Sequence, residues 1–169
     1  ILLNAFDNDI VYVTTTITPI TEELIKAIPI LVYALLFSNK QEVVAPIALS
    51  LGIGFGMFEN MTILVQNISS ITIGWAVIRG FSTALMHGMC TLLVGYGICF
   101  VRKVRKLFYC GTFALLFFAF IYHGIFNMLV QSDYRYFAFV LPVITYIPLI
   151  VILRKSRTKA KKKEIKPAA

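Results

Sequence analysis

The amino-acid sequence predicts an all-α, polytopic helical membrane protein with about five transmembrane helices. Of its 169 residues, 59% are hydrophobic, and the mean hydropathy of +0.82 is well above that of soluble domains. Five apolar stretches can each cross a hydrocarbon core of about 30 Å, which takes roughly 20 helical residues. Because the sequence lacks the alternating pattern of a membrane barrel, we expect these stretches to be helices.

We expect the five helices near residues 16–37, 43–66, 71–100, 108–131 and 134–153. The third stretch is long enough to tilt or to protrude from the bilayer. Residues 1–153 would then form one helical transmembrane domain, and residues 154–169 a basic tail. Because the chain begins at Ile1 and not at a methionine, further spans could precede it.

The basic residues are distributed unevenly between the two sides of a five-span topology. One side holds Lys40, the cluster at 102–106 and the tail, whereas the other holds the aspartates at 7, 9 and 133 and only Arg135. The positive-inside rule therefore places the tail in the cytoplasm and the N-terminus outside. The tail carries eight Lys/Arg and one Glu, so it supplies +7 of the net charge of +8. Such a tail is typical of a segment that binds anionic headgroups or is disordered, and we expect no nucleic-acid partner.

Three glutamates and both histidines of the chain lie inside the predicted spans, namely Glu22, Glu23, Glu59, His87 and His123. Ionisable groups at bilayer depth are costly and typically mark a functional site. At 1.5 Å per residue from the predicted cytoplasmic edge of each helix, Glu22, Glu59 and both histidines lie at heights of roughly 20–24 Å. We therefore expect two imidazoles and at least two carboxylates at one level, in the outer half of the bilayer.

Helical spacing indicates which of these groups contact one another. Glu22 and Lys26 are four residues apart, in the favourable order for an ion pair on one helix face. Glu23 points about 100° away from Glu22, so at most one of them pairs ideally with Lys26. Arg79 lies about two turns outward of His87 and could pair with a carboxylate. A buried ion pair that only fixes the helix register is the structural alternative.

Three glycines precede Glu59 on the second predicted helix. Gly52, Gly54 and Gly56 carry no side chain at a level where this helix must approach a neighbour. Small residues at such spacing let membrane helices pack backbone to backbone. We therefore expect close packing of the second helix just before Glu59.

Four short motifs occur in order on successive predicted helices. They are Pro19-Ile-Thr-Glu22-Glu23-Leu-Ile-Lys26, Gly54-Phe-Gly-Met-Phe-Glu59-Asn60, Arg79 followed by His87, and His123-Gly-Ile-Phe-Asn127. Together they resemble the PrsW family of intramembrane proteases, which is similar to the CAAX prenyl endopeptidases and the Abi immunity proteins. The resemblance implies hydrolysis of a peptide bond in a membrane-associated protein, such as a single-span anti-sigma factor.

The resemblance also implies roles for individual residues. Glu22 or Glu23, together with His87, would activate the attacking water. His123 and Asn127 would polarise the scissile carbonyl. The chain departs from the CAAX pattern, because a lysine stands three residues after Glu23 where that pattern has an arginine four residues after. The supporting residues would be Lys26, Asn60 and Arg79.

Two questions stay open at the level of the sequence. Glu59, in its PrsW-like pair with Asn60, could be catalytic or structural. A metal could also take part, because two imidazoles and a carboxylate are a typical catalytic ligand set for zinc. The glutamate mechanism requires no metal, and the sequence lacks the H-E-x-x-H signature of zinc proteases. If a metal binds, its candidate ligands are Glu22, Glu23, Glu59, His87 and His123.

Other chemistries fit the sequence less well. An aspartyl mechanism needs aspartates within spans, but those at 7, 9 and 133 map to loops or ends. A serine mechanism could use Ser82 with His123, although a helical serine more often bonds to the preceding turn. A proton-coupled transporter is the second function class, since intramembrane ionisable groups form proton relays. A catalytically silent immunity or scaffold relative is the third.

Overall fold

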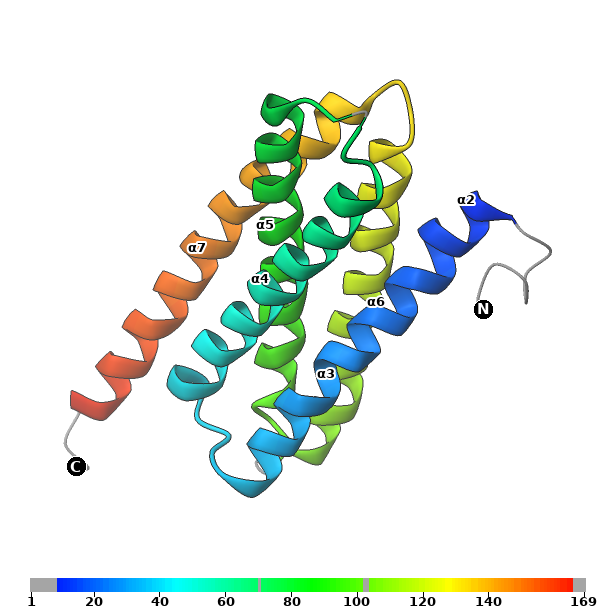
Figure 1. Cartoon of the computed structure of the whole chain (residues 1–169). Coiled ribbons are helices and arrows are strands. Elements are labelled where there is room, and N and C mark those ends of the chain that lie inside the picture. Colours follow the sequence, from blue (N-terminus) through cyan, green and yellow to red (C-terminus); the bar gives the residue numbers. More distant parts are fainter. Residues whose placement is uncertain (1–8, 70, 102–103, 166–169) are drawn as a thin grey trace.

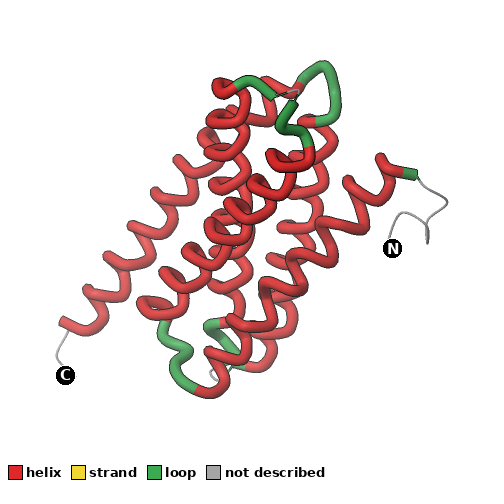
Figure 2. The backbone as a smooth tube through the Cα atoms, in the orientation of Figure 1, coloured by secondary structure: helices red, strands yellow, loops and turns green. Residues whose placement is uncertain are grey.

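The protein is a bundle of long helices joined by short turns (Figures 1 and 2). The computed structural model describes residues 9–69, 71–101 and 104–165, and no strand occurs among them. The elements are α2 (Ile10–Tyr12), the π-helix η1 (Val13–Ile17), α3 (Thr18–Leu36), α4 (Gln41–Gln66), α5 (Ile73–Ile98), α6 (Arg105–Val130) and α7 (Arg135–Ile165). The all-α fold predicted from the sequence is confirmed.

Three of the five long helices are long and apolar enough to cross a membrane, as judged by length and composition. They are α4, α5 and, within α6, Phe108–Val130. α3 is apolar over most of its 19 residues but carries three charged side chains, Glu22, Glu23 and Lys26. The apolar part of α7 is shorter, from Arg135 to Val151. The structure is that of a polytopic helical membrane protein.

Helix α5 lies at the centre of the bundle and packs against α3, α4, α6 and α7 (Figure 1). Of its span, 61% is buried, compared with 22% for α4 and 28% for α6. Its buried apolar residues include Met86, Cys90 and Val94. They belong to one core cluster together with Ile30 of α3 and Ala48 of α4. The outer helices expose large apolar side chains, as helices that face lipid do.

Two glycines bring α4 against α5. A Cβ on Gly52 would collide with the carbonyl oxygen of His87, and one on Gly56 would lie 2.9 Å from Cδ2 of the same histidine. The backbones therefore approach as expected at these two positions. Gly54 was expected to contribute as well, but a Cβ there would meet nothing within 4 Å. That prediction is wrong because Gly54 lies on the opposite face of α4.

The first long helix begins earlier than predicted, because α2, η1 and α3 continue one another from Ile10 to Leu36. In η1 the N–H of Thr18 donates to the carbonyl of Val13, five residues back. Pro19 has no N–H with which to continue this pattern to the carbonyl of Thr14. The side-chain amide of Asn127 on α6 donates to that carbonyl instead, at 2.9 Å. This hydrogen bond thus connects the π-helix to α6.

The two ends of the bundle differ in charge. The C-terminal ends of α3, α5 and α7 lie at one end, and those of α4 and α6 lie at the other (Figure 1). Lys40 and Lys106 therefore gather at the first end, as the sequence indicated, while Asp7, Arg102 and Lys103 lie outside the described residues. Helix α7 continues without a break across the predicted boundary at residue 153 to Ile165.

Candidate active site

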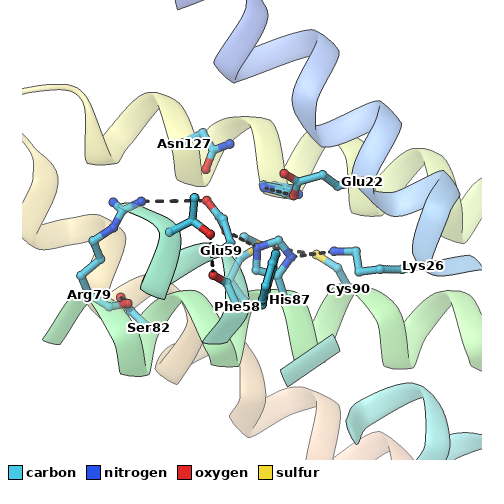
Figure 3. Close-up of polar contacts among 12 residues, drawn as sticks. Glu22, Lys26, Phe58, Glu59, Arg79, Ser82, His87, Cys90 and Asn127 are labelled. Atoms are coloured by element: carbon cyan, nitrogen blue, oxygen red, sulfur yellow. Dashed lines mark hydrogen bonds and ion pairs between the residues drawn. The ribbon is translucent and has the colours of Figure 1, made fainter. Parts of the chain in front are cut away.

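Four helices bring six polar side chains together in the interior of the bundle, and four of the six are labelled in Figure 3. We call them the polar cluster: Glu22, Glu23 and Lys26 from α3, Glu59 from α4, His87 from α5 and His123 from α6. The two imidazole rings meet edge to face, with their centroids 4.7 Å apart. The structure therefore brings together the three glutamates and both histidines that the sequence placed inside spans.

Glu23 lies at the centre of the cluster and is 1% exposed. Its Oε1 lies 2.6 Å from Lys26 Nζ and 2.9 Å from His123 Nδ1. The ion pair expected between Glu22 and Lys26 is therefore made by Glu23. Both glutamates lie within one turn of Lys26, but the more deeply buried Glu23 is the one whose carboxylate contacts the ammonium. The Oε2 atom of Glu23 is buried and has no hydrogen-bond partner among the described residues.

His87 is held at both ring nitrogens. Lys26 Nζ lies 2.6 Å from its Nδ1, and Glu59 Oε2 lies 2.7 Å from its Nε2. Because an ammonium group only donates, Nδ1 accepts and the N–H of Nε2 donates to Glu59. Glu59 is approached in turn by Arg79, whose Nη2 lies 3.9 Å from its Oε1. The Arg79 guanidinium also lies 5.3 Å from the ring centroid of Trp75.

Glu22 and His123 face each other with free lone pairs. Glu22 Oε2 lies 3.8 Å from His123 Nε2. Both atoms are buried, and neither has a hydrogen-bond partner among the described side chains. Since His123 Nδ1 bonds to the carboxylate of Glu23, its N–H is at Nδ1 and Nε2 carries the lone pair. Two acceptors at this distance can share a water molecule, a proton or a cation.

The same atoms suit a metal ion. One ligand atom from each of Glu22, His87 and His123 lies within 4.8 Å of the other two. Two imidazoles and a carboxylate are a typical zinc donor set. His123 also has the carboxylate on its other nitrogen that orients metal-bound histidines. The donors therefore fit a metal, provided that His87 frees one of its nitrogens.

Two asparagines predicted to belong to the site lie at its edge. Asn127 is one turn after His123, and its amide donates to the carbonyl of Thr14 on η1. Asn60 is 7% exposed, and its amide nitrogen would lie 2.9 Å from a Cβ on Gly80, so it fills the contact between α4 and α5. Ser82 donates its hydroxyl to the carbonyls of Ile78 and Arg79 in the preceding turn, as expected of a structural serine.

Phe55 is part of the site, although the sequence did not single it out. Its ring centroid lies 4.8 Å from Lys26 Nζ and 5.4 Å from the ring centroid of His87. An ammonium over an aromatic face is a favourable contact in a dry site. The spacing of four residues before Glu59 places Phe55 on the same face of α4, and this spacing was the available signal.

Comparison with known proteins gives one match. Residues 2–153 match the family described as PrsW family intramembrane metalloprotease. The chain belongs to this family. Membership of the PrsW family supports the assignment of the chain as an integral membrane protein and an intramembrane protease. No curated protein and no solved structure matches the chain.

Proposed function

We propose that this PrsW family member is an intramembrane endopeptidase in which Glu22 is the general base. The observation that carries the proposal is the free Oε2 of Glu22, 3.8 Å from the free Nε2 of His123. The side chain of Glu22 is 16% exposed, whereas that of Glu23 is 1% exposed. Glu22 is therefore the more accessible of the two carboxylates.

The geometry suggests how water is activated. A water molecule shared by Glu22 and His123 would donate one hydrogen to each, which directs its oxygen lone pair away from both. As that oxygen bonds to the scissile carbonyl carbon, Glu22 takes the proton. The C–N bond then breaks, and Glu22 returns the proton to the leaving amine. This role for His123 differs from the polarising role that the family resemblance implies.

The remaining residues position this pair. Glu23 fixes the tautomer of His123 through the Nδ1 contact at 2.9 Å. Glu59 and Lys26 hold His87, whose ring packs edge to face on that of His123. Asn127 uses one amide hydrogen on Thr14, and we assign its second amide hydrogen to the oxyanion of the tetrahedral intermediate.

The family description includes a metal, and the donors fit one. Glu22, His87 and His123 are the residues that would hold it. A metal bound there would polarise the scissile carbonyl and acidify bound water. The orienting contacts of Glu23 with His123 and of Glu59 with His87 would serve the site in the same way.

The location of the cluster suggests where the substrate is cut. Glu59 lies about two helical turns, roughly 10 Å, before the end of α4 at Gln66, and much farther from the end that carries Lys40. If the end with Lys40 is cytoplasmic, the scissile bond lies in the outer half of the bilayer. A single-span regulator such as an anti-sigma factor, cut first on its outer side, fits this geometry.

The test of the proposed function is cleavage of tagged single-span proteins in proteoliposomes. We expect Glu22→Gln to lower the cleavage rate by about 100-fold or more, because it removes the base. Glu42→Gln is the matched control, since Glu42 is exposed at the start of α4 and far from the cluster. Cleavage by Glu22→Gln at the wild-type rate would remove Glu22 from the mechanism. Ion-driven uptake without cleavage by any of the proteins would favour a transporter.

A further inference from the structure

Lys26 is a buried cation in the middle of the polar cluster. It is 2% exposed, and its ammonium lies 2.6 Å from Glu23 Oε1. The ammonium also lies 2.6 Å from His87 Nδ1 (Figure 3). A charge buried this deeply is stable only when it is paired and hydrogen-bonded. Lys26 therefore depends on these two contacts.

The contact with His87 decides what else that imidazole can bind. A metal needs a nitrogen lone pair, and the lone pair at Nδ1 accepts from Lys26 while the hydrogen at Nε2 is donated to Glu59. The third donor of the Glu22, His87 and His123 group is thus engaged by the ammonium. With two donors left, the group is one protein ligand short of a typical catalytic zinc site.

The balance of charge is a second, independent reason why the Lys26 ammonium opposes binding of a divalent metal. The polar cluster contains three carboxylates and the Lys26 ammonium, and the Arg79 guanidinium lies beside it, 3.9 Å from Glu59. With neutral imidazoles and ionised carboxylates, the cluster and Arg79 together carry one excess negative charge. A divalent ion would turn this into one excess positive charge, next to the ammonium and away from water. Without the ammonium, the same ion would leave the cluster neutral, which is the favourable state in a dry interior.

We propose that the Lys26 ammonium and a divalent metal compete for the Glu22, His87 and His123 group. The ammonium occupies His87 when no metal is bound, and metal binding requires it to leave. The inference concerns metal binding alone and stands whether or not the protein cleaves peptides. Its failure is therefore distinguishable from failure of the proposed function.

The experiment is a titration of the purified full chain in detergent micelles with Co²⁺, followed by visible absorption, and with Zn²⁺, followed by calorimetry, at one fixed pH. We expect Lys26→Met to bind both metals roughly tenfold more tightly than wild type, or better. Lys40→Met is the matched control, because Lys40 is exposed at the turn before α4. We expect it to bind as wild type does. Adding Glu22→Gln to Lys26→Met should abolish the gain.

Lys26→Gln is a second variant, which tests the proposal independently of whether Lys26→Met folds. Its neutral amide removes the charge but can still donate to Glu23, so that carboxylate keeps a hydrogen-bond partner. We expect this variant to bind the metals more tightly than wild type as well. Equal or weaker binding by the folded Lys26 variants would overturn the proposal. Absence of metal binding in all the proteins would overturn it too.

Discussion

The adjacent glutamates of α3 occupy different environments although they are chemically identical. Glu23 is enclosed by Lys26 and His123 at 2.6 and 2.9 Å. Glu22 keeps 16% of its side chain exposed, and its Oε2 has no hydrogen-bond partner among the described residues. Enclosure fixes a side chain in one geometry, whereas partial exposure lets it meet a substrate. We therefore assign orientation to Glu23 and proton transfer to Glu22.

This assignment predicts that Glu23→Gln destabilises the protein. The neutral amide leaves the Lys26 ammonium buried without its counter-ion, and breaking a buried ion pair costs about 3–5 kcal/mol. The free energy of unfolding in mixed micelles should fall by about that amount. The exposed control Glu42→Gln should stay within about 0.5 kcal/mol of wild type. Wild-type stability of Glu23→Gln would show that the contact with Lys26 is not structural.

At the scale of elements, the position of Glu59 depends on how closely α4 approaches α5. Gly56 lies three residues before Glu59, and a Cβ on it would lie 2.9 Å from Cδ2 of His87. The close contact at Gly56 therefore fixes the positions of both Glu59 and His87. These two side chains form a hydrogen bond of 2.7 Å. Backbone packing of this kind fixes the site without any polar interaction of its own.

Gly56→Ala should therefore impair both folding and activity. The added methyl group would push α4 away from α5, and overpacking of this kind costs about 1–3 kcal/mol. We expect a lower unfolding temperature and slower cleavage. Gly54→Ala is the matched control, because a Cβ there would meet nothing within 4 Å. Equal effects of the two substitutions would contradict the packing argument.

The helices could be predicted from the sequence, but some contacts between them could not. Apolar length predicted five helices, and heights counted along four of them brought Glu22, Glu59 and both histidines to one level. Helical spacing favoured Glu22 as the partner of Lys26. The structure selects Glu23 because the choice depends on where the histidines of two other helices lie. Local spacing on α3 does not contain that information.

The π-helix at 13–17 was also beyond sequence reasoning. Pro19 was read as part of the first motif. The Thr14 carbonyl, to which Pro19 cannot donate, accepts from the side-chain amide of Asn127 on α6. The signal was Pro19 itself, because a proline inside a helix removes a donor. The identity of the replacement donor depends on tertiary packing, so the contact could not be predicted.

At the scale of the whole molecule, the bundle separates its basic end from its polar cluster. The turn with Lys40 lies at one end, and Glu59 lies about two helical turns from the other. This asymmetry predicts the depth of cleavage once the basic end is placed in the cytoplasm by the positive-inside rule. It ties the orientation of the protein to the position of the scissile bond.

The most direct test of the account is therefore to map the cut. Mass spectrometry of both fragments of a single-span substrate, cleaved in proteoliposomes, identifies the bond that is hydrolysed. We predict a bond inside the membrane-spanning segment, in the half away from the basic end, and formation of these fragments about 100-fold more slowly, or slower still, with Glu22→Gln. A cut outside the spanning segment, or at its cytoplasmic edge, would contradict cleavage by the polar cluster at the depth where α3, α4, α5 and α6 place it.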